Sequence, residues 1–81
     1  MRVEFSERFT ASYIAAPPEI HKAFGKQLAL LLRDSRHPSL HAAKLDEKDR
    51  RFYARVNDAW RFYDYREGDA YYLVDITPHP K

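Results

Sequence analysis

The chain has 81 residues and a mass of 9.6 kDa, enough for one small domain and too little for a second hydrophobic core. Hydrophobic residues make up 44% and charged residues 32%, a balance typical of a globular domain rather than a disordered segment. The sequence has no cysteine, which excludes disulfides and cysteine-ligated zinc, and its net charge of +2 is too small to predict nucleic-acid binding alone.

Nothing in the sequence predicts a membrane segment or a secretory signal. The longest purely apolar run extends only from Leu28 to Leu32, far short of the ~20 residues that a membrane span needs. Residues 1–16 carry four charged side chains and lack the apolar stretch of a signal peptide. We therefore expect a cytoplasmic protein.

The first sixteen residues predict a strand followed by a helix. Residues 2–5 alternate between polar and apolar side chains, as in a short strand. A first helix follows Ser6, which is a good N-cap, and the proline pair at 17–18 ends it. Its apolar residues recur at helical spacing: Phe9, Tyr13 and Ala16.

A second helix is predicted from Pro18 to Arg33 or Asp34. Its apolar stripe consists of Ile20, Phe24, Leu28 and Leu31, widened by Ala23 and Leu32. Gly25 in the middle costs about 1 kcal/mol relative to alanine, which favours close approach of the first helix at that point. The two helices are predicted to form an antiparallel hairpin that covers a sheet.

The second half of the chain predicts three strands. Periodicity disappears from 35 to 50, where Leu40 and Leu45 are expected to anchor a polar loop. Period-two patterns then cover residues 51–56, 60–66 and 70–76, separated by loops at 57–59 and 67–69. The order is β-α-α-β-β-β, an α+β domain with a helical hairpin packed on a largely antiparallel sheet. The first strand can join either edge of the meander.

Three-residue loops decide which side chains share a face of this sheet. They place Arg55 opposite Arg61, and Arg61 beside Asp75. One face is predicted to form the core, with Phe52, Ala54, Val56, Trp60, Phe62, Asp64, Tyr72, Val74 and Ile76. The other is predicted to carry Arg51, Tyr53, Arg55, Arg61, Tyr63, Tyr65, Tyr71, Leu73 and Asp75.

Two arginines directly across a strand pair repel unless an anion compensates them. Among tyrosines, such a pair is suited to a phosphate backbone with stacked bases. The alternative is an ordinary solvated face in which Arg61 pairs with Asp75. His79, on the parity of Asp75, is predicted to emerge at the rim of this face.

Metal-free RNA cleavage is the chemistry that these residues favour. It needs a base for the 2′-hydroxyl, an acid for the leaving 5′-oxygen and cations for the charge on the phosphorane. Histidine, with a usual pKa of about 6.5, can serve as acid or base. Lys44 or His41 from the loop could reach in beside the arginines.

Other chemistries have no support in the sequence. The four histidines lack a convincing metal-ligand spacing, and neither a serine-nucleophile motif nor a glycine-rich phosphate loop is present.

The sequence resembles the RelE/ParE superfamily of toxins from type II toxin–antitoxin modules, and within it the RelE/YoeB-like branch. The residues that carry the resemblance run from Arg36-His37-Pro38-Ser39-Leu40 through Lys44-Leu45, Phe52-Tyr53-Ala54-Arg55-Val56-Asn57-Asp58 and Arg61 to Tyr72-Leu73-Val74-Asp75-Ile76 and His79. The resemblance implies a microbial-RNase-like fold and a metal-independent endoribonuclease that cuts mRNA on the ribosome. It also implies a cognate antitoxin as partner, with no cofactor and no membrane.

The resemblance also implies site residues. It gives Arg61 the role of stabilising the transition state, His79 that of acid or base, Lys44 that of an RNA-contacting loop residue and Arg55 a supporting role. The residues expected to bind RNA are His41, Arg51, Tyr53, Tyr63 and Lys81. Candidates for an acidic general base are Asp46, Glu47 and Asp49.

Two alternatives stay open. The branch commonly continues after the histidine with another His, Asp or Tyr and a tail tyrosine, whereas this sequence reads His79-Pro80-Lys81. That departure is consistent with a catalytically weak domain that still binds RNA or an antitoxin. A toxin of the ParE branch, which inhibits DNA gyrase, is the other alternative and needs no histidine at 79.

Overall fold

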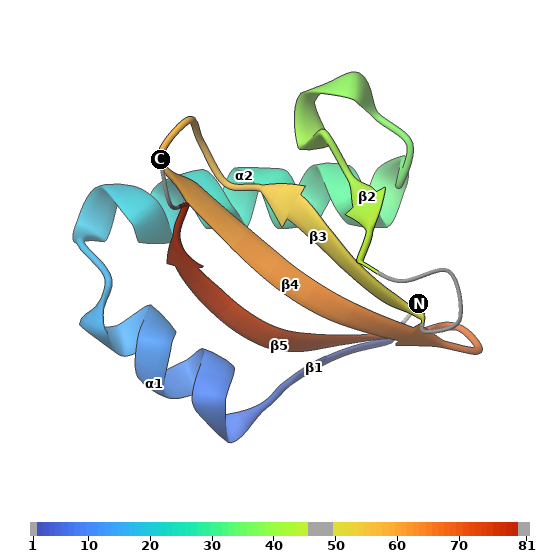
Figure 1. Cartoon of the computed structure of the whole chain (residues 1–81), viewed down its shortest axis with the longest axis horizontal. Helices are drawn as coiled ribbons and strands as arrows, with labels where there is room; N and C mark the ends of the chain where they lie inside the picture. The colour runs from blue at the N-terminus through green and yellow to red at the C-terminus, as the bar shows by residue number, and fades with distance from the viewer. Residues whose placement is uncertain (1, 46–49, 80–81) are drawn as a thin grey trace.

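Five strands form one sheet in the computed structural model, which describes residues 2–45 and 50–79 (Figure 1). The strands are β1 (Arg2–Phe5), β2 (Ala43–Lys44), β3 (Arg51–Arg55), β4 (Trp60–Glu67) and β5 (Ala70–Pro78). Their order in the sheet is β1-β5-β4-β3-β2; β1 runs parallel to β5, and the other neighbours are antiparallel. The predicted α+β architecture is confirmed. The first strand joins the β5 edge, and the two-residue β2 is an addition to the predicted order.

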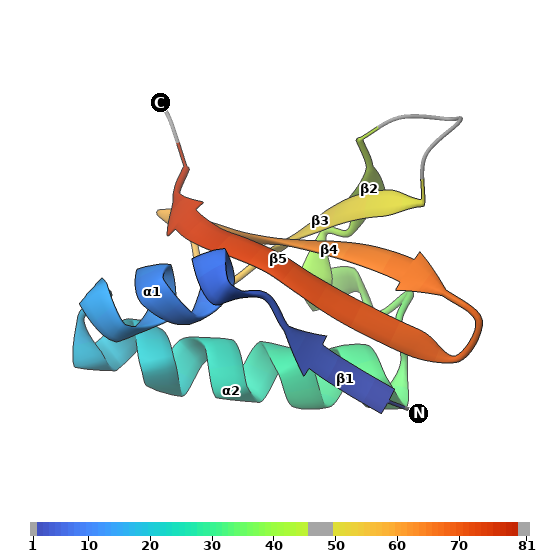
Figure 2. The ribbon, with the colours of Figure 1, turned by 90° about the horizontal axis from the view of Figure 1, so that it is seen from below.

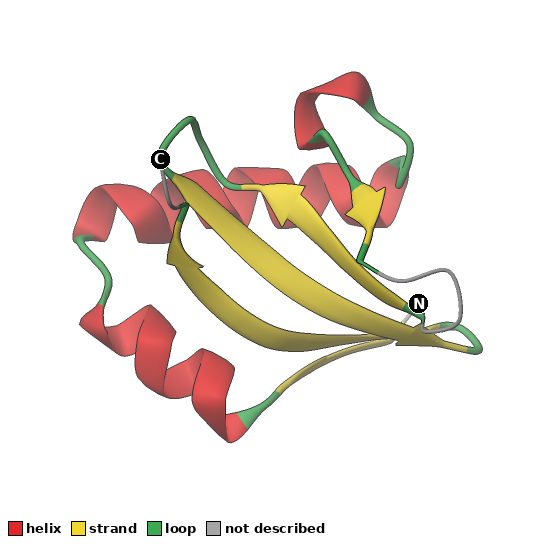
Figure 3. Cartoon of the chain, in the orientation of Figure 1, coloured by secondary structure: helices red, strands yellow, loops and turns green. Residues whose placement is uncertain are grey.

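Two helices accompany the sheet, α1 (Glu7–Ala15) and α2 (Pro18–Arg33). Ser6 caps α1 as predicted, because its Oγ accepts a hydrogen bond of 2.9 Å from the Phe9 N–H. Figure 2 shows α2 lying along one face of the sheet, with α1 between it and the edge of β5. In Figure 3 the opposite face of the sheet is turned to the viewer, and neither of these helices crosses it.

The core lies between α2 and the sheet. Phe24 of α2 is buried, and its ring meets Phe62 of β4 edge-on, with 5.3 Å between centroids. Phe9 of α1 packs against Phe24 at 5.2 Å. The predicted stripe of α2 is confirmed except at Leu32, which is exposed because the helix turns that position away from the sheet.

The segment after α2 is fixed by one buried amide. Gln27 donates hydrogen bonds from Nε2 to the Ser39 carbonyl at 3.0 Å and to the Arg55 carbonyl at 2.8 Å. Ser39 belongs to a 3-10 helix, η1 (Pro38–Leu40), whose Leu40 is fully buried as predicted. Leu45, the second predicted anchor, is half exposed because it follows β2 at the sheet edge, away from the core.

The first hairpin has the predicted register. Ala54 lies opposite Phe62 and Arg55 opposite Arg61, around a loop of three residues. The second hairpin differs, because its turn has two residues, Gly68 and Asp69, and Glu67 pairs with Ala70. Gly68 adopts φ +58°, the left-handed conformation that two-residue hairpin turns require.

The shorter turn reverses the faces of the first half of β5. Tyr71 and Leu73, predicted to face outward, are buried, whereas Tyr72 and Val74, predicted for the core, are partly exposed. A β-bulge then restores the predicted alternation, because Tyr63 pairs with Asp75 and the next pair joins Asp64 to Leu73, which leaves Val74 unpaired. Beyond the bulge Ile76 is buried as predicted.

Gly25 does not mark a close approach between the helices, and that prediction is wrong. A Cβ built at Gly25 would meet no atom within 4 Å, and the same holds at Gly68. Gly25 instead borders an open apolar groove between α1 and α2. The two glycines therefore differ in backbone conformation and not in available space.

This contrast gives a paired stability prediction. Gly25→Ala should raise the free energy of unfolding by about 1 kcal/mol, because alanine favours the helix and meets no obstacle. Gly68→Ala should lower it by about 1 kcal/mol, because a side chain is strained at positive φ. Urea denaturation of both variants and the wild type measures the two changes; shifts of the same sign would contradict the assignment.

Candidate functional site

The face of the sheet away from α2 carries the predicted arginines and tyrosines. Arg55 and Arg61 lie directly opposite each other, and Tyr53 lies opposite Tyr63. We call these four residues the Arg–Tyr face. Successive residues on one side of a strand are about 7 Å apart, so the arginine pair and the tyrosine pair form adjacent rows.

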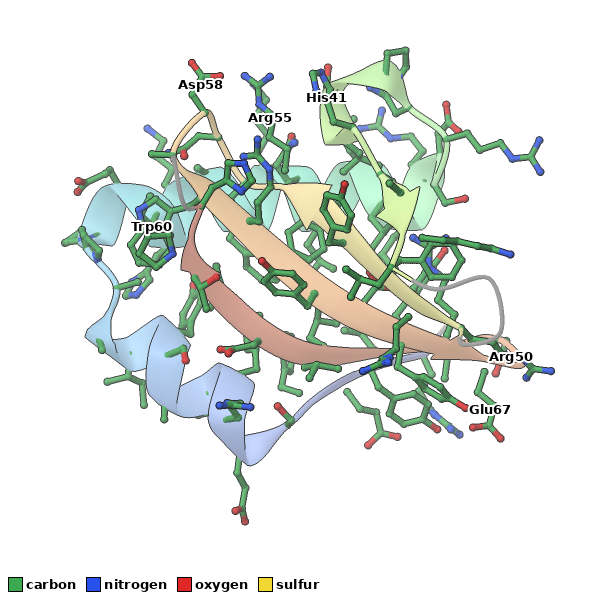
Figure 4. The ribbon with its side chains drawn as sticks, in the orientation of Figure 1. His41, Arg50, Arg55, Asp58, Trp60 and Glu67 are labelled. Atoms are coloured by element: carbon green, nitrogen blue, oxygen red, sulfur yellow. The ribbon has the colours of Figure 1, made fainter. Side chains whose placement is uncertain are left out.

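Arg55 is compensated by Asp58, which was not among the predicted site residues. Its Nη2 lies 2.7 Å from Oδ1 of Asp58, which is almost fully exposed in the adjoining hairpin (Figure 4). An exposed ion pair of this kind contributes about 1 kcal/mol or less, so a phosphate can replace the carboxylate at little cost. The spacing of three residues between Arg55 and Asp58 across a tight loop is the signal that could have identified the pair.

Arg61 is held by backbone carbonyls instead. Its Nη1 donates hydrogen bonds to the carbonyls of Asn57 at 2.6 Å and Trp60 at 3.0 Å. No carboxylate among the described residues forms an ion pair with it. Asn57 shapes the same loop, because its Oδ1 accepts from the N–H groups of Ala59 and Trp60, each at 2.9 Å. The loop thus fixes the guanidinium in place and leaves its charge available to a ligand.

The predicted contact between Arg61 and Asp75 is absent, because the shorter turn and the bulge together place Asp75 opposite Tyr63 and Thr77 opposite Arg61. The Asp75 carboxylate instead contacts two residues of α1. Its Oδ1 accepts a hydrogen bond of 2.7 Å from Ser12 Oγ, and Oδ2 lies 3.5 Å from Nε of Arg8.

His79 lies beside the same hairpin. Its N–H donates to the carbonyl of Ala59 at 2.6 Å, and the preceding residue, Pro78, lies opposite Trp60. Thr77, two residues earlier, is on the side of Arg61. Alternation along the strand therefore places the exposed His79 at the rim of the Arg–Tyr face, as predicted.

His41 lies between η1 and β2, on the opposite side of the arginine pair from His79. It ends η1 with a left-handed backbone, φ 47°, and its N–H donates to the Pro38 carbonyl at 3.2 Å. Figure 4 shows the side chains of His41 and Arg55 at the same end of β3. The arginine pair is thus flanked by His41 on the β2 side and by His79 on the β5 side.

The predicted RNA-binding tyrosines of the Arg–Tyr face are followed along the strands by a second tyrosine pair. The rings of Tyr53 and Tyr63 are partly exposed, and their centroids lie 6.3 Å apart. Tyr65 and Tyr72 form a second pair at 6.2 Å. Arg51 is exposed opposite Tyr65, two rows from Arg55, at the far end of β3.

Lys44 is not brought to the arginines. It lies opposite Phe52, and Phe52 lies opposite the buried Asp64, so Lys44 is on the helix side of the sheet. Its Nζ lies 5.8 Å from the centroid of the Phe52 ring. The predicted contributions of Lys81 and of the base candidates Asp46, Glu47 and Asp49 concern residues outside the described part of the chain.

Asp64, predicted for the core face, is buried there. Its Oδ2 lies 2.9 Å from Nε of Arg66, while Oδ1 and Nη2 of Arg66 are buried without a hydrogen-bond partner among the described residues. Burial raises the pKa of the Asp64 carboxyl above its ordinary value of 3.8, and the ion pair with Arg66 only partly opposes the rise.

Two further observations bear on the class of site. Within residues 2–45 and 50–79, no three His, Asp or Glu side chains are grouped so that they could hold a metal ion. In the same part of the chain, no helix is both long and apolar enough to cross a bilayer.

Comparison by sequence gives no assignment. No protein-family model matches the chain. No curated protein matches it either.

Comparison by structure gives a clear class of fold, that of the RelE-type toxins. A YoeB/ParE toxin from Agrobacterium tumefaciens superimposes with a TM-score of 0.82 at 10% identity, over 99% of this chain and 100% of that one. The YoeB dimer from Staphylococcus aureus gives 0.81 at 14%, covering 99% and 98%. The intact E. coli RelBE toxin–antitoxin complex gives 0.77 at 12%, with the same coverage. The fold implied by the sequence resemblance is confirmed.

The buried carboxyl leads to a pH-dependent stability prediction. A raised pKa means that the folded state binds the proton more tightly than the unfolded state. The stabilisation from protonated Asp64 is complete below the unfolded-state pKa and is lost as the pH rises through the folded-state value. We expect the unfolding free energy of the wild type, measured relative to Asp64→Asn, to fall as the pH rises from the ordinary carboxyl value of 3.8 through the raised folded-state pKa.

Urea denaturation across this pH range measures the difference, and Glu67→Gln, which removes an exposed carboxyl from the same strand, is the control. Arg66 stays charged throughout, so it shifts the curves without changing their slope. Parallel curves for the wild type and Asp64→Asn would contradict the assignment.

Proposed function

We propose that the protein is the toxin of a type II toxin–antitoxin module and acts as a metal-independent endoribonuclease on mRNA. The observation that carries the proposal is the arginine pair on the open face, flanked by His41 and His79. The confirmed RelE-type fold supports it, because the solved structures that share this fold are toxins.

The arginines suit the phosphate that reacts. Cleavage of RNA through its 2′-oxygen passes through a phosphorane with additional negative charge, which fixed cations stabilise. Arg61 is fixed by two carbonyls and has no carboxylate partner among the described residues, so it is the main stabiliser in this proposal. Arg55 supports it once its exposed partner Asp58 is displaced.

The histidines supply the proton transfers. A base takes the proton of the 2′-hydroxyl, and the 2′-oxygen then bonds to phosphorus. The bond from phosphorus to the 5′-oxygen breaks as that oxygen receives a proton from the acid. We assign the acid to His79 and the base to His41, because they flank the arginine pair from opposite sides. Strand spacing of about 4.8 Å puts β2 and β5 roughly 14 Å apart, which leaves room for a phosphate between the two rings.

The tyrosines suit single-stranded RNA. Tyr53 and Tyr63 are partly exposed in the row next to the arginines, where bases that flank the reacting phosphate can stack on them. Contact with an unpaired strand matches a substrate presented on the ribosome. The mRNA and the ribosome are therefore the partners in catalysis.

Cleavage by purified protein tests the catalytic assignment. Translating ribosomes incubated with the wild type should yield new mRNA ends, mapped by primer extension. Arg61→Gln should reduce the cleavage rate by about 10²–10³-fold, because a fixed charge at the phosphorane is lost. His79→Ala should reduce it by about 10²–10⁴-fold, because proton transfer to the leaving oxygen is lost. Lys22→Gln, on the exposed side of α2, is the matched control.

Absence of cleavage by the folded wild type would refute the nuclease. Inhibition of gyrase supercoiling by the same preparation would identify the ParE-like alternative. A wild type that binds RNA without cleaving it would identify the catalytically weak domain.

The toxin assignment has a separate test in cells. The RelBE structure is a toxin–antitoxin complex, and we propose an equivalent partner for this protein. Expression of the wild type should arrest growth, Arg61→Gln should not, and co-expression of a small protein from an adjacent reading frame should restore growth. A viable count that is unchanged by the wild type at high expression would contradict the assignment.

A further inference from the structure

A cavity of about 590 Å³ opens on the helix side of the β2 edge. Five basic side chains line it: Arg36, His37, His41, Lys44 and Arg66. Within the described part of the chain, none of its lining residues is acidic. A volume of this size is in the usual range for small-ligand sites, and a lining of this charge selects an anion.

The loop that carries three of these side chains, Arg36, His37 and His41, is already fixed in place. The Arg36 N–H donates to Oδ1 of Asp34 at 3.1 Å, and the Ser39 N–H donates to Nδ1 of His37 at 3.1 Å. Since Nδ1 of His37 accepts this bond, the ring N–H that can donate to a ligand is at Nε2. The Gln27 amide holds the next turn through the Ser39 carbonyl. An anion would therefore meet prearranged donors and require little ordering of the loop.

The aromatic ring of Phe52 is flanked by cations. Cζ of Arg66 lies 3.8 Å from its centroid and Nζ of Lys44 lies 5.8 Å from it. Arg66 is compensated by Asp64. Arg36 and Lys44 form no ion pair with any carboxylate among the described residues, so their charges are available to a ligand.

We propose that this pocket binds a phosphate of the RNA backbone next to the one that is cleaved, an inference that rests on the proposed nuclease function. His41 lines the pocket and also lies at the edge beside Arg55. β2 and β4 are about 10 Å apart, two strand spacings, which a strand of a few nucleotides covers. RNA that crosses the short β2 edge can thus contact the Arg–Tyr face and the pocket together. Lys44 is assigned to this second phosphate and not to the reacting one.

The salt dependence of RNA binding tests the pocket. The probe is a short 2′-O-methyl RNA, which cannot react because its 2′-oxygen is blocked, followed by fluorescence anisotropy from about 50 to 200 mM salt. For single strands the slope of log affinity against log salt changes by about 0.7 for each phosphate that the protein neutralises. Arg36→Gln and Lys44→Gln should each weaken the slope by up to this amount, and Lys22→Gln should leave it unchanged. Both targets are exposed, so circular dichroism should show intact folds.

An unchanged slope in the folded double variant Arg36→Gln/Lys44→Gln would overturn the proposal. If the wild type still cleaves mRNA in that case, the nuclease stands and only the pocket assignment fails. If the slope falls in the variants while the wild type never cleaves, the phosphate site stands and the nuclease fails. A poly-glutamate peptide that loses affinity for the double variant, with RNA binding unchanged, would assign the pocket to an acidic protein instead.

Discussion

The hairpin of residues 57–59 determines the geometry of the candidate site. Its length of three residues puts Arg55 and Arg61 directly opposite each other. Its own groups then hold them, since Asp58 pairs with Arg55 and the Asn57 carbonyl accepts from Arg61. The carbonyl of Ala59 also binds the N–H of His79, which fixes the end of β5 at the same place. Two like charges are therefore tolerated side by side because one short loop supplies a partner to each and positions the histidine beside them.

Alternation along the strands explains which parts of the site were predictable. The Asn-Asp sequence of the first loop and the flanking period-two pattern define the register from local signals alone. The second hairpin required two corrections, a turn shorter by one residue and a bulge at Val74. Each correction shifts the pairing by one residue in the same direction, so the faces are reversed only between 70 and 74 and agree with expectation from Asp75 onward, where the partners differ by two residues. The predicted face of His79 is therefore correct, although the residues predicted to pair with β5 were wrong.

Other features depend on tertiary contacts that no local pattern encodes. A two-residue strand such as β2 has too few positions to show a period, and its pairing with β3 is what turns Lys44 to the helix side. Likewise Gly25 was interpreted as a packing signal, whereas it borders an empty groove, because a glycine in a helix has the same local signature in both situations. The buried Asp64 was identified from the register, but its partner Arg66, two residues along the same strand, was not.

The placement of carboxylates makes a nearly neutral chain locally basic. Asp75 is occupied by Ser12 and Arg8 at the α1 side, and Asp64 is buried against Arg66. Asp58 compensates Arg55 through an exposed pair that contributes little. These three acids thus already have partners within the domain. Arg61 on one face, and Arg36 and Lys44 on the other, form no ion pair with a carboxylate among the described residues. Because the two basic regions meet at the short β2 edge, a single polyanionic strand can bind to both, which neither a net charge of +2 nor either region alone would indicate.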